Sequence, residues 1–338
     1  MNVTTIGFDI AKGVFQVHGV DGAGEVTLRR RLSRAQVLTL FEHLPPCLVG
    51  MEACGSAHHW ARAISALGHD VRLISPAYVK PYVKRSKTDA ADAAAICEAV
   101  SRPHMRFVPI KSRDDQALAL SYKARSLMVA QRTAAVNAMR AHLSEFGIIS
   151  RQGPIGSAEL VSLIRNGDER LPDLARENLA EVADVIEVVE AKIAQLDAKL
   201  ADIAKKDERC RRLIKVPGIG PVAAGTLIAL SGDMKRFRSG RDYAAWLGLT
   251  PRQNSSGERV RIGRMSKAGN RDLRVLLVLG QMSVMRRARS NPPRISTWVL
   301  DLMKRRPPLV VAVAMAAKTA RIIWAMLTRG EEYRLQAA

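Results

Sequence analysis

The segment VTTIGFDIAKGVFQVHGV, residues 3–20, decides how the N-terminal part of the chain folds. Its apolar residues predict two strands, 3–10 and 14–20, which the short turn AKG joins. A third strand is expected over 25–32, after the turn DGAGE, so these strands form a meander. One residue breaks the pattern, because Asp9 lies near the end of the first strand, where a core strand is normally apolar.

The residues that follow alternate between strand and helix patterns. Apolar runs at 48–51 and 71–74 predict two strands, and a helix over 56–67 separates them and ends at Gly68. The Ala-rich segment 89–100 predicts another helix. A meander followed by strand, helix, strand and helix is the order of an RNase H-like (RuvC-like) α/β domain, which we assign to residues 1–110.

The remainder of the chain is predicted to be mainly helical, with one long helix over 114–143 and another from about 172 to 206. Apolar residues in the second helix recur at steps of four and three, namely Val182, Ile186, Val189, Ile193, Leu196, Leu200 and Ile203. An intramolecular hairpin would explain this heptad pattern, but an intermolecular coiled coil, giving a dimer or tetramer, is favoured. We therefore expect a helical, coiled-coil region over 111–206 and a mostly α-helical domain over 207–338.

Positive charge is concentrated in the C-terminal part of the chain. The net charge is +21, and residues 206–338 hold 27 basic side chains against 9 acidic ones. Such an excess indicates a polyanionic partner, with a merely soluble basic protein as the simpler alternative. Aromatic residues make up 4% of the sequence, so base stacking is not expected to dominate nucleic-acid binding.

Several other classes of protein are disfavoured. No signal-peptide pattern is present at the N-terminus, and Lys318 and Arg321 interrupt the apolar stretch 309–327, which predicts a buried helix and no membrane partner. The four cysteines lack CxxC spacing, which argues against zinc and a disulfide framework. We expect a cytoplasmic, nucleoid-associated protein.

Four acidic residues occupy positions that the expected fold would bring together. Asp9 ends the first strand, Glu52 follows the apolar run LVGM, and Asp89 and Asp92 share one face of a helix. Converging carboxylates repel one another unless hard cations lie between them, and such oxygen ligands suit Mg²⁺, with Mn²⁺ as a substitute. Two such ions serve phosphodiester chemistry. Taken singly, any of these acids could be a cap, and Asp89 could be the N-cap of its helix.

A Gly-rich turn in the basic half is a candidate contact to the DNA backbone. The segment VPGIGPVAA, residues 216–224, resembles a helix–hairpin–helix element, in which Gly218 and Gly220 would expose backbone N–H groups to a DNA phosphate. An ordinary turn between two helices is the alternative. Such a contact would position the DNA backbone without reading its sequence.

The segment GLTPRQNSSGERVRIGRMSKAGNRDLRVLL, residues 248–277, contains a small polar loop and a dense basic stretch, and a helix is expected near Asn270. Either Ser255 or Ser256 could be a nucleophile held near a phosphate, although composition alone favours two turn residues. No histidine stands beside them, so activation would have to come from the metal site. Its candidate nucleic-acid contacts are Arg252, Arg259, Arg261, Arg264, Lys267 and Arg271, and Arg274 is a further basic residue.

These motifs, in this order, resemble the transposases of the insertion-sequence-110 family, and most closely its 1111 subgroup; the Piv-type DNA invertases are related. The matching stretches are GFDIAK, VGMEACGSAHHWA, KRSKTDAADAAAICEA and RFVPIKS in the first half, and VPGIGPVAA and residues 248–277 in the second. The resemblance covers nearly the whole chain. It implies a RuvC-like nuclease domain in which Asp9, Glu52, Asp89 and Asp92 are Mg²⁺ ligands.

The resemblance also implies a serine nucleophile, which would be Ser256 because it immediately precedes the glycine, with Ser255 as the ambiguous neighbour. In the family this serine meets the carboxylates of another protomer in a tetramer, and a structured bridge RNA guides the enzyme. We therefore expect a recombinase that cuts and rejoins DNA for a mobile element. The alternatives are a Holliday-junction-type endonuclease that uses the carboxylates alone, and a non-catalytic nucleic-acid-binding protein.

Overall fold

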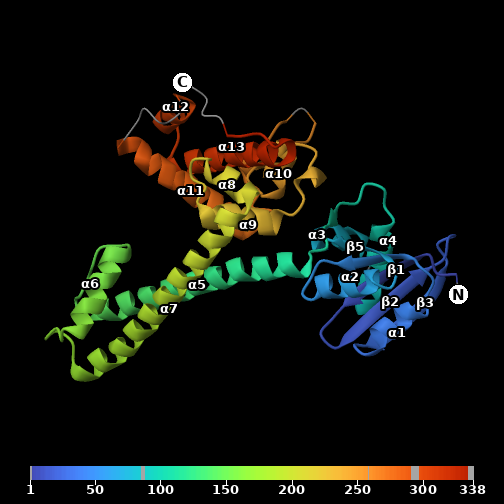
Figure 1. The fold of residues 1–338 in the computed structure, drawn as a ribbon, viewed down its shortest axis with the longest axis horizontal. Helices are drawn as coiled ribbons and strands as arrows, with labels where there is room; N and C mark the ends of the chain where they lie inside the picture. Colours follow the sequence, from blue (N-terminus) through green and yellow to red (C-terminus); the bar gives the residue numbers. More distant parts are fainter. Residues whose placement is uncertain (1, 85–87, 258, 291–296, 334–338) are drawn as a thin grey trace. The chain divides into compact units, whose positions relative to one another are not determined.

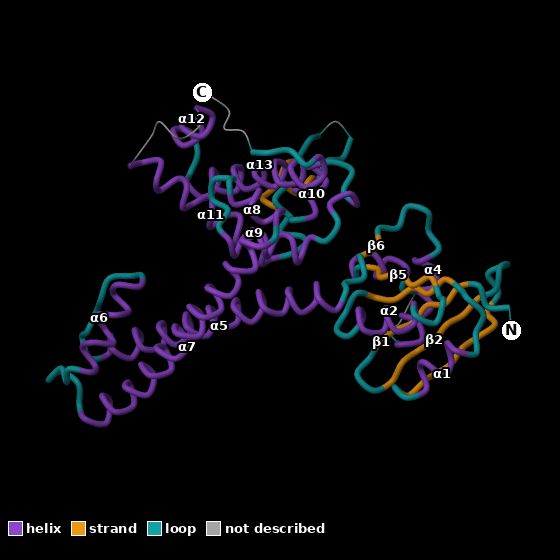
Figure 2. Tube along the Cα trace, viewed as in Figure 1, coloured by secondary structure: helices purple, strands orange, loops and turns teal. Residues whose placement is uncertain are grey.

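The computed structural model describes residues 2–84, 88–257, 259–290 and 297–333 (Figures 1 and 2). The chain divides into two compact units, Met1–Arg113 and Asp114–Ala338. The first is a mixed α/β unit and the second is almost entirely helical. The expected α/β N-terminal region and mostly helical C-terminal region are thus confirmed.

The first unit is built on a six-stranded sheet. Its strands lie in the spatial order β3 (Val26–Ser33), β2 (Val14–Val20), β1 (Thr5–Ile10), β4 (Leu48–Glu52), β5 (Asp70–Ile74) and β6 (Phe107–Val108). Strands β1, β4 and β5 are parallel, and the other neighbours pair antiparallel. The meander and the next two strands lie where the sequence predicts them, whereas β6, with only two residues, was not predicted.

An aromatic core covers one face of this sheet beneath α1 (Gln36–Glu42) and α2 (Ala57–Ser65). Phe8 stacks on Phe15 with ring centroids 5.5 Å apart, and Trp60 of α2 meets Phe15 edge-on at 5.2 Å. On the other face lies α4 (Asp89–Val100), which α3 (Pro76–Val79) and the short 3-10 helix η1 (Lys80–Tyr82) precede. The short helices α1 and α3 were not predicted.

The second unit begins with two long helices that pair within the chain. They are α5 (Arg113–Glu145) and α7 (Asp173–Lys206), with the unpredicted helix α6 (Pro154–Arg165) between them in sequence. Ion pairs join α5 to α7, Arg125 to Asp197 and Arg132 to Glu190, the latter at 4.0 Å. Ile186 of the heptad series packs in the core that these helices share. The hairpin alternative therefore accounts for part of the heptad pattern, and an intermolecular coiled coil stays a prediction.

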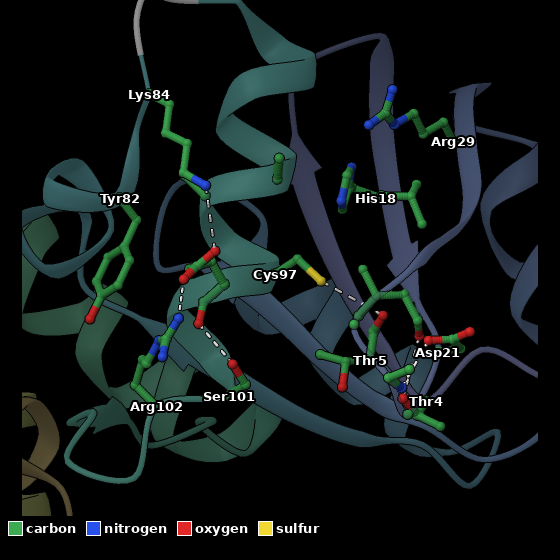
Figure 3. A pocket seen from close by; sticks show the side chains of 18 of the residues that line it. Thr4, Thr5, His18, Asp21, Arg29, Tyr82, Lys84, Cys97, Ser101 and Arg102 are labelled. Carbon is green, nitrogen blue, oxygen red and sulfur yellow. Dashed lines mark hydrogen bonds and ion pairs between the residues drawn. The ribbon is translucent and has the colours of Figure 1, made fainter.

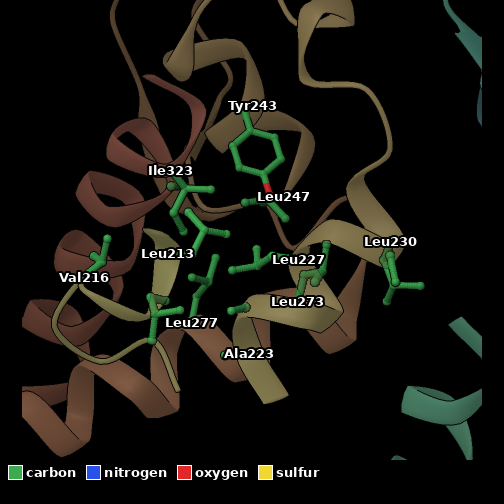
Figure 4. Close-up of a cluster of buried hydrophobic side chains, with 14 of the residues drawn as sticks. Leu213, Val216, Ala223, Leu227, Leu230, Tyr243, Leu247, Leu273, Leu277 and Ile323 are labelled. Carbon is green, nitrogen blue, oxygen red and sulfur yellow. The ribbon is translucent and has the colours of Figure 1, made fainter. Parts of the chain in front are cut away.

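The rest of this unit packs around two clusters of buried residues, of which Figure 4 shows the larger. Its elements are α8 (Glu208–Ile214), α9 (Pro221–Ser231), η2 (Met234–Arg236), α10 (Gly240–Trp246), a hairpin of β7 (Pro251–Gln253) and β8 (Ile262–Met265), α11 (Arg271–Ser290), α12 (Thr297–Arg305) and α13 (Pro308–Arg329). Leu213, Leu247 and Leu277 come together here from three different elements. The hydroxyl group of the fully buried Tyr243 forms a hydrogen bond with the Ser231 hydroxyl, at 2.8 Å.

Helix α13 is the most apolar long helix that the structure describes. By length and composition alone it would suffice to cross a membrane. It instead packs against α10 and α11 and buries a continuous stripe of residues, from Val311 to Met326. The ammonium of Lys318 lies over the ring of Trp298 at 4.8 Å. This is the arrangement of a core helix.

Candidate carboxylate site and serine hairpin

The pairing of β1 with β4 sets two of the four predicted acids side by side. The strands are parallel, with Phe8 opposite Met51, so Asp9 and Glu52 follow at the same level. Neighbouring strands lie about 4.8 Å apart, and alternate residues of a strand point to the same face. Each acid therefore shares its face with the glycine two positions earlier, Gly7 or Gly50.

Both glycines are required because α4 lies directly on that face. A Cβ on Gly7 would come within 2.5 Å of the Cys97 nitrogen, and one on Gly50 would meet the same helix. The Cys97 thiol donates to the Thr5 carbonyl at 3.7 Å, while Ala93, one turn earlier in α4, lies against Gly7. Helix α4 therefore runs antiparallel to β1, and its first turn lies toward the end of β1 that carries Asp9.

The first turn of α4 supplies the other two acids. Thr88 is its N-cap, and the Thr88 Oγ1 accepts a hydrogen bond from the Ala91 N–H at 3.2 Å. The alternative in which Asp89 caps this helix is therefore wrong. Asp89 is exposed and Asp92 half-buried, and both lie where the helix dipole favours negative charge.

The four carboxyl groups interact electrostatically. The pKa of the half-buried Asp9 is raised from its ordinary value of 3.8 to about 6. Burial is the largest cause, followed by the charges of Asp92, Asp89 and Glu52, while a backbone hydrogen bond from Ile10 acts in the opposite direction. The fold thus brings Glu52, Asp89 and Asp92 within electrostatic reach of Asp9.

The chemistry of these ligands fits a hard divalent cation. All four donors are carboxylates, which suit Mg²⁺ or Mn²⁺. Within the described ranges, no three His, Cys, Asp or Glu side chains lie close enough together to bind one metal ion. Mutual repulsion keeps such carboxylates apart, and a cation is the species that would draw them together.

A separate groove of about 750 Å³ follows the outer side of α4 (Figure 3). His18 and Arg29 line it on the sheet side, and Lys84 and Arg102 lie on the side of α4. Burial and the charge of Arg29 lower the pKa of His18. Glu98 forms ion pairs with both Lys84, at 4.0 Å, and Arg102. The four predicted acids are not among the residues that line this groove.

The two candidate serines lie in a β-hairpin. Its ladder extends beyond β7 and β8, because Asn254 N–H donates to the Arg261 carbonyl at 3.0 Å, and Ser256 and Arg259 exchange backbone hydrogen bonds of 3.3 and 3.2 Å. Gly257, at the tip, has a φ of +57°. Backbone pairing therefore continues through Asn254 and Ser256, within the small polar loop expected from the sequence, up to the turn.

The hairpin gives the two serines different environments. The Ser255 hydroxyl accepts a hydrogen bond from the Arg261 backbone N–H at 3.2 Å, so it helps to hold the two strands together. Ser256 is exposed, and no residue that the structure describes forms a hydrogen bond with its hydroxyl. Of the pair, Ser256 is the one that presents an unengaged hydroxyl at the tip.

The predicted basic contacts surround this hairpin. All are exposed, namely Arg252, Arg259, Arg261, Arg264, Lys267 and Arg271. Arg274 differs from them, because it is buried and its guanidinium donates to the carbonyls of Leu247, Ala268, Gly269 and Asn270, the first at 3.0 Å. It joins the two ends of the hairpin segment to the start of α11 and is not accessible to a nucleic acid.

The Gly-rich turn connects α8 to α9. Gly218 has a φ of +85°, and a Cβ there would lie 2.7 Å from the Gln281 amide nitrogen and 2.8 Å from the Gly280 oxygen. Packing against α11 therefore explains this glycine without a phosphate. Gly220 is the exposed N-cap of α9, with open space around it. Binding of nucleic acid by Gly218 and Gly220 stays a prediction.

Sequence reasoning overlooked the glycines beneath α4. The signal was present, because GFD and GME both place a glycine two residues before the acid, on neighbouring strands. It also overlooked the short segment 233–246, where Arg236 lies against aromatic rings.

Comparisons with known proteins identify the family of the chain. A model described as "Transposase IS116/IS110/IS902 family" matches residues 210–296, and an IS110-type DEDD model described as "Transposase" matches residues 6–148. The chain is 49% identical to a probable family 20 transposase of Pseudomonas aeruginosa, over 99% of both chains. It is 40% identical to the transposase for IS1328 of Yersinia enterocolitica, over 97% of this chain and 98% of the relative. It is 38% identical to the transposase for IS1111A of Coxiella burnetii, over 99% and 93%.

The chain belongs to the IS116/IS110/IS902 family of transposases, as its motifs predict. It is a transposase of an insertion sequence, a DNA-binding enzyme that cleaves and rejoins DNA. Its DEDD domain implies dependence on a divalent metal ion.

Proposed function

We propose that this transposase cuts DNA with an RNase H-like (RuvC-like) site in which Asp9, Glu52, Asp89 and Asp92 hold Mg²⁺, or Mn²⁺ in its place, and with Ser256 as the nucleophile. One observation carries the proposal. Helix α4 lies antiparallel on β1, so the acids of two strands and one helix share one end of the sheet. The strand order β3-β2-β1-β4-β5 supports the RuvC-like interpretation.

The two strand acids and the two helix acids have one task, which is to bind the cation beside the scissile phosphate. When bound, the metal stabilises negative charge on the attacking and leaving oxygens. An unassisted serine is a weak nucleophile, and its own hairpin offers no histidine as a base. We therefore keep the expectation that a second copy of the chain, in a dimer or tetramer, brings its carboxylates to Ser256.

The proposed reaction conserves the phosphodiester bond energy. The Ser256 Oγ attacks the phosphorus, the bond from phosphorus to one strand breaks, and that strand leaves with a free hydroxyl group. The serine proton passes to a neighbouring carboxylate, which then delivers a proton to the leaving oxygen of that strand. In rejoining, a strand hydroxyl attacks the phosphoserine, and Ser256 regains a proton. No ATP is required, in agreement with the lack of a GxxxxGK[ST] motif in the sequence.

The partners that we propose are the DNA of the element ends and target, a structured guide RNA, and further copies of the chain. Exposed arginines on both strands of the serine hairpin support a nucleic-acid partner, because their charges can neutralise phosphates. The heptad pattern of α7 supports self-association. A transposase acts on chromosomal and mobile DNA, so we place it in the bacterial cytoplasm, at the nucleoid.

The test compares Ser256→Ala with Ser255→Ala in the full chain, incubated with element-end DNA, the RNA of the flanking non-coding segment and Mg²⁺. We expect Ser256→Ala to bind DNA normally but to form no covalent protein–DNA adduct on a denaturing gel and no recombinant. Ser255→Ala should keep both activities at a reduced level, because its hydroxyl supports the hairpin.

Two results would contradict the proposal. An adduct formed by Ser256→Ala but lost in Ser255→Ala would assign the nucleophile to Ser255. Nicked DNA with free 5′-phosphates, formed equally by both variants, would favour the endonuclease that uses only the carboxylates.

A further inference from the structure

The segment 233–246 places one arginine in an unusual environment. The Arg236 guanidinium lies 4.4 Å from the ring centroid of Phe237 and 4.7 Å from that of Trp246. Phe237 also contacts Tyr243, with ring centroids 5.0 Å apart, and both of these rings are buried in the core. The guanidinium group is therefore in contact with two aromatic rings that are tilted by 56° to each other.

The Arg236 guanidinium forms no ion pair with any residue that the structure describes, although the charge of Asp233 acts on it. The side chain is half-buried, its Nε is shielded from solvent, and that nitrogen has no hydrogen-bond partner among the residues described. Burial lowers the pKa of Arg236, which means that the fold as it stands disfavours the cation. A partly desolvated cation without a carboxylate partner is destabilising until an anion binds it.

The nearest acids are already engaged with backbone groups. The Asp233 carboxylate accepts the Lys235 N–H at 2.9 Å, and the Asp242 carboxylate accepts the Arg238 N–H at 3.3 Å. Both therefore stabilise the local turns, and Asp233, whose charge acts on Arg236, forms no direct ion pair with it in the part of the chain that is described. The anion that Arg236 lacks has to come from outside this segment.

Further cationic residues lie on the same segment as Arg236, or next to it in the fold. Lys235, Arg238 and Arg241 are all exposed on the same short segment. Helix α13 adds Arg321, because a Cβ on Gly240, next to Arg241, would lie 3.0 Å from the Arg321 Cα. Several exposed cations on one segment suit the repeated phosphates of a nucleic-acid backbone better than a single small anion.

The cluster lies at the base of the serine hairpin. Trp246 is the last residue of α10. The segment that follows β8 comes back to this point, because a Cβ on Gly269 would collide with the Trp246 carbonyl oxygen. Arg274 binds the adjoining Leu247 carbonyl at 3.0 Å. A nucleic-acid strand with one phosphate bound at Arg236 could therefore extend to the basic residues of the hairpin.

We propose that Arg236, which lies against the rings of Phe237 and Trp246 on the same segment as the exposed Lys235, Arg238 and Arg241, is a binding site for phosphodiester groups of DNA or RNA. Arginine is suited to this role because its planar donors match phosphate oxygens and its face stacks on aromatic rings. The site extends the nucleic-acid binding of the proposed function but takes no part in cleavage, so it can be tested without catalysis.

The experiment measures the affinity of the full chain for a duplex DNA and for a single-stranded RNA by fluorescence anisotropy, in EDTA, over a series of salt concentrations. Arg236→Gln should weaken binding about 10-fold at physiological salt and lower the salt slope for DNA by about one. The matched control is Arg329→Gln. Arg329 also lies over a tryptophan, at 5.8 Å, but pairs with Glu331 at 3.6 Å. We expect this control to change affinity less than about 3-fold.

A second measurement separates binding from packing. Inorganic pyrophosphate should raise the thermal midpoint of the wild-type protein and leave that of Arg236→Gln unchanged. If Arg236 only fills space between the rings, both Arg236→Gln and Arg236→Lys will lower the midpoint while the salt slope stays at the wild-type value, and the proposal is then wrong.

If Arg236→Gln does not fold, the double variant Arg238→Gln and Arg241→Gln keeps the test open, because both side chains are exposed. It should lower the DNA salt slope by about two, and an unchanged slope would overturn the proposal. A loss seen with only one polymer supports the site and identifies its natural ligand.

Discussion

Replacing Asp9 by asparagine should make the metal-free protein more stable at neutral pH, although it should abolish cleavage. The ionised Asp9 is disfavoured in the folded chain, where its pKa is about 6 against an ordinary 3.8. That difference of about two units corresponds to about 3 kcal/mol. Because Asp9 is only half-buried, solvent screening reduces this to about 1.5 kcal/mol. We expect Asp9→Asn to gain that amount at pH 7.5 in EDTA, measured by urea denaturation.

The sign of the pH dependence follows from linkage. Between pH 3.8 and 6 the folded state holds a proton on Asp9 that the unfolded state releases, so this group stabilises the fold progressively as the pH falls. The advantage of Asp9→Asn should therefore shrink to about 0.5 kcal/mol at pH 4.5. Asp70→Asn is the control, because Asp70 is exposed and pairs with Arg72 at 2.7 Å. It should show no gain. Equal stability of Asp9→Asn and wild type at pH 7.5 would refute the electrostatic reasoning.

Three further variants test the packing that supports the two candidate sites. Gly7→Ala should lose about 1–3 kcal/mol by forcing α4 off β1, whereas Gly13→Ala, in open space, should be nearly neutral; chemical denaturation compares the two. Arg274→Met should lose about 3 kcal/mol because buried carbonyls lose their donor, and a thermal scan that gives the same midpoint as exposed Arg271→Met would contradict this. Tyr122→Phe should cost nothing in calorimetry, because its hydroxyl is buried with no partner among the residues described, and a clear loss would reveal an unseen one.

The first unit could be predicted from the sequence to a large extent because its signals are local. Strand periodicity located β1 and β2, and the acid within an apolar strand identified Asp9 as unusual. The direction of α4 over the sheet could not be predicted, because it depends on contacts between Gly7 and Cys97, residues that are 90 positions apart. Such contacts have no periodicity in the sequence.

The second unit was less predictable because similar residues serve different purposes there. Arg274 and Arg271 are three positions apart in one basic segment, yet the first is buried on backbone carbonyls and the second is exposed. The heptad of α7 has the same spacing whether its partner is α5 or another chain. Composition also gave no reason to separate Ser255 from Ser256, although only the Ser255 hydroxyl accepts a hydrogen bond across the hairpin.

The close contact of α4 with Gly7 and Gly50 has a consequence for how mobile elements decay. A copy of this gene can keep all four acidic codons and still be inactive, if a single base change turns either glycine into a larger residue. Surveys that score a genomic copy as intact from its acidic residues alone will therefore count some that are inactive. Inspection of the two glycine codons, each two positions upstream of an acid, would separate inactive copies from those still able to move.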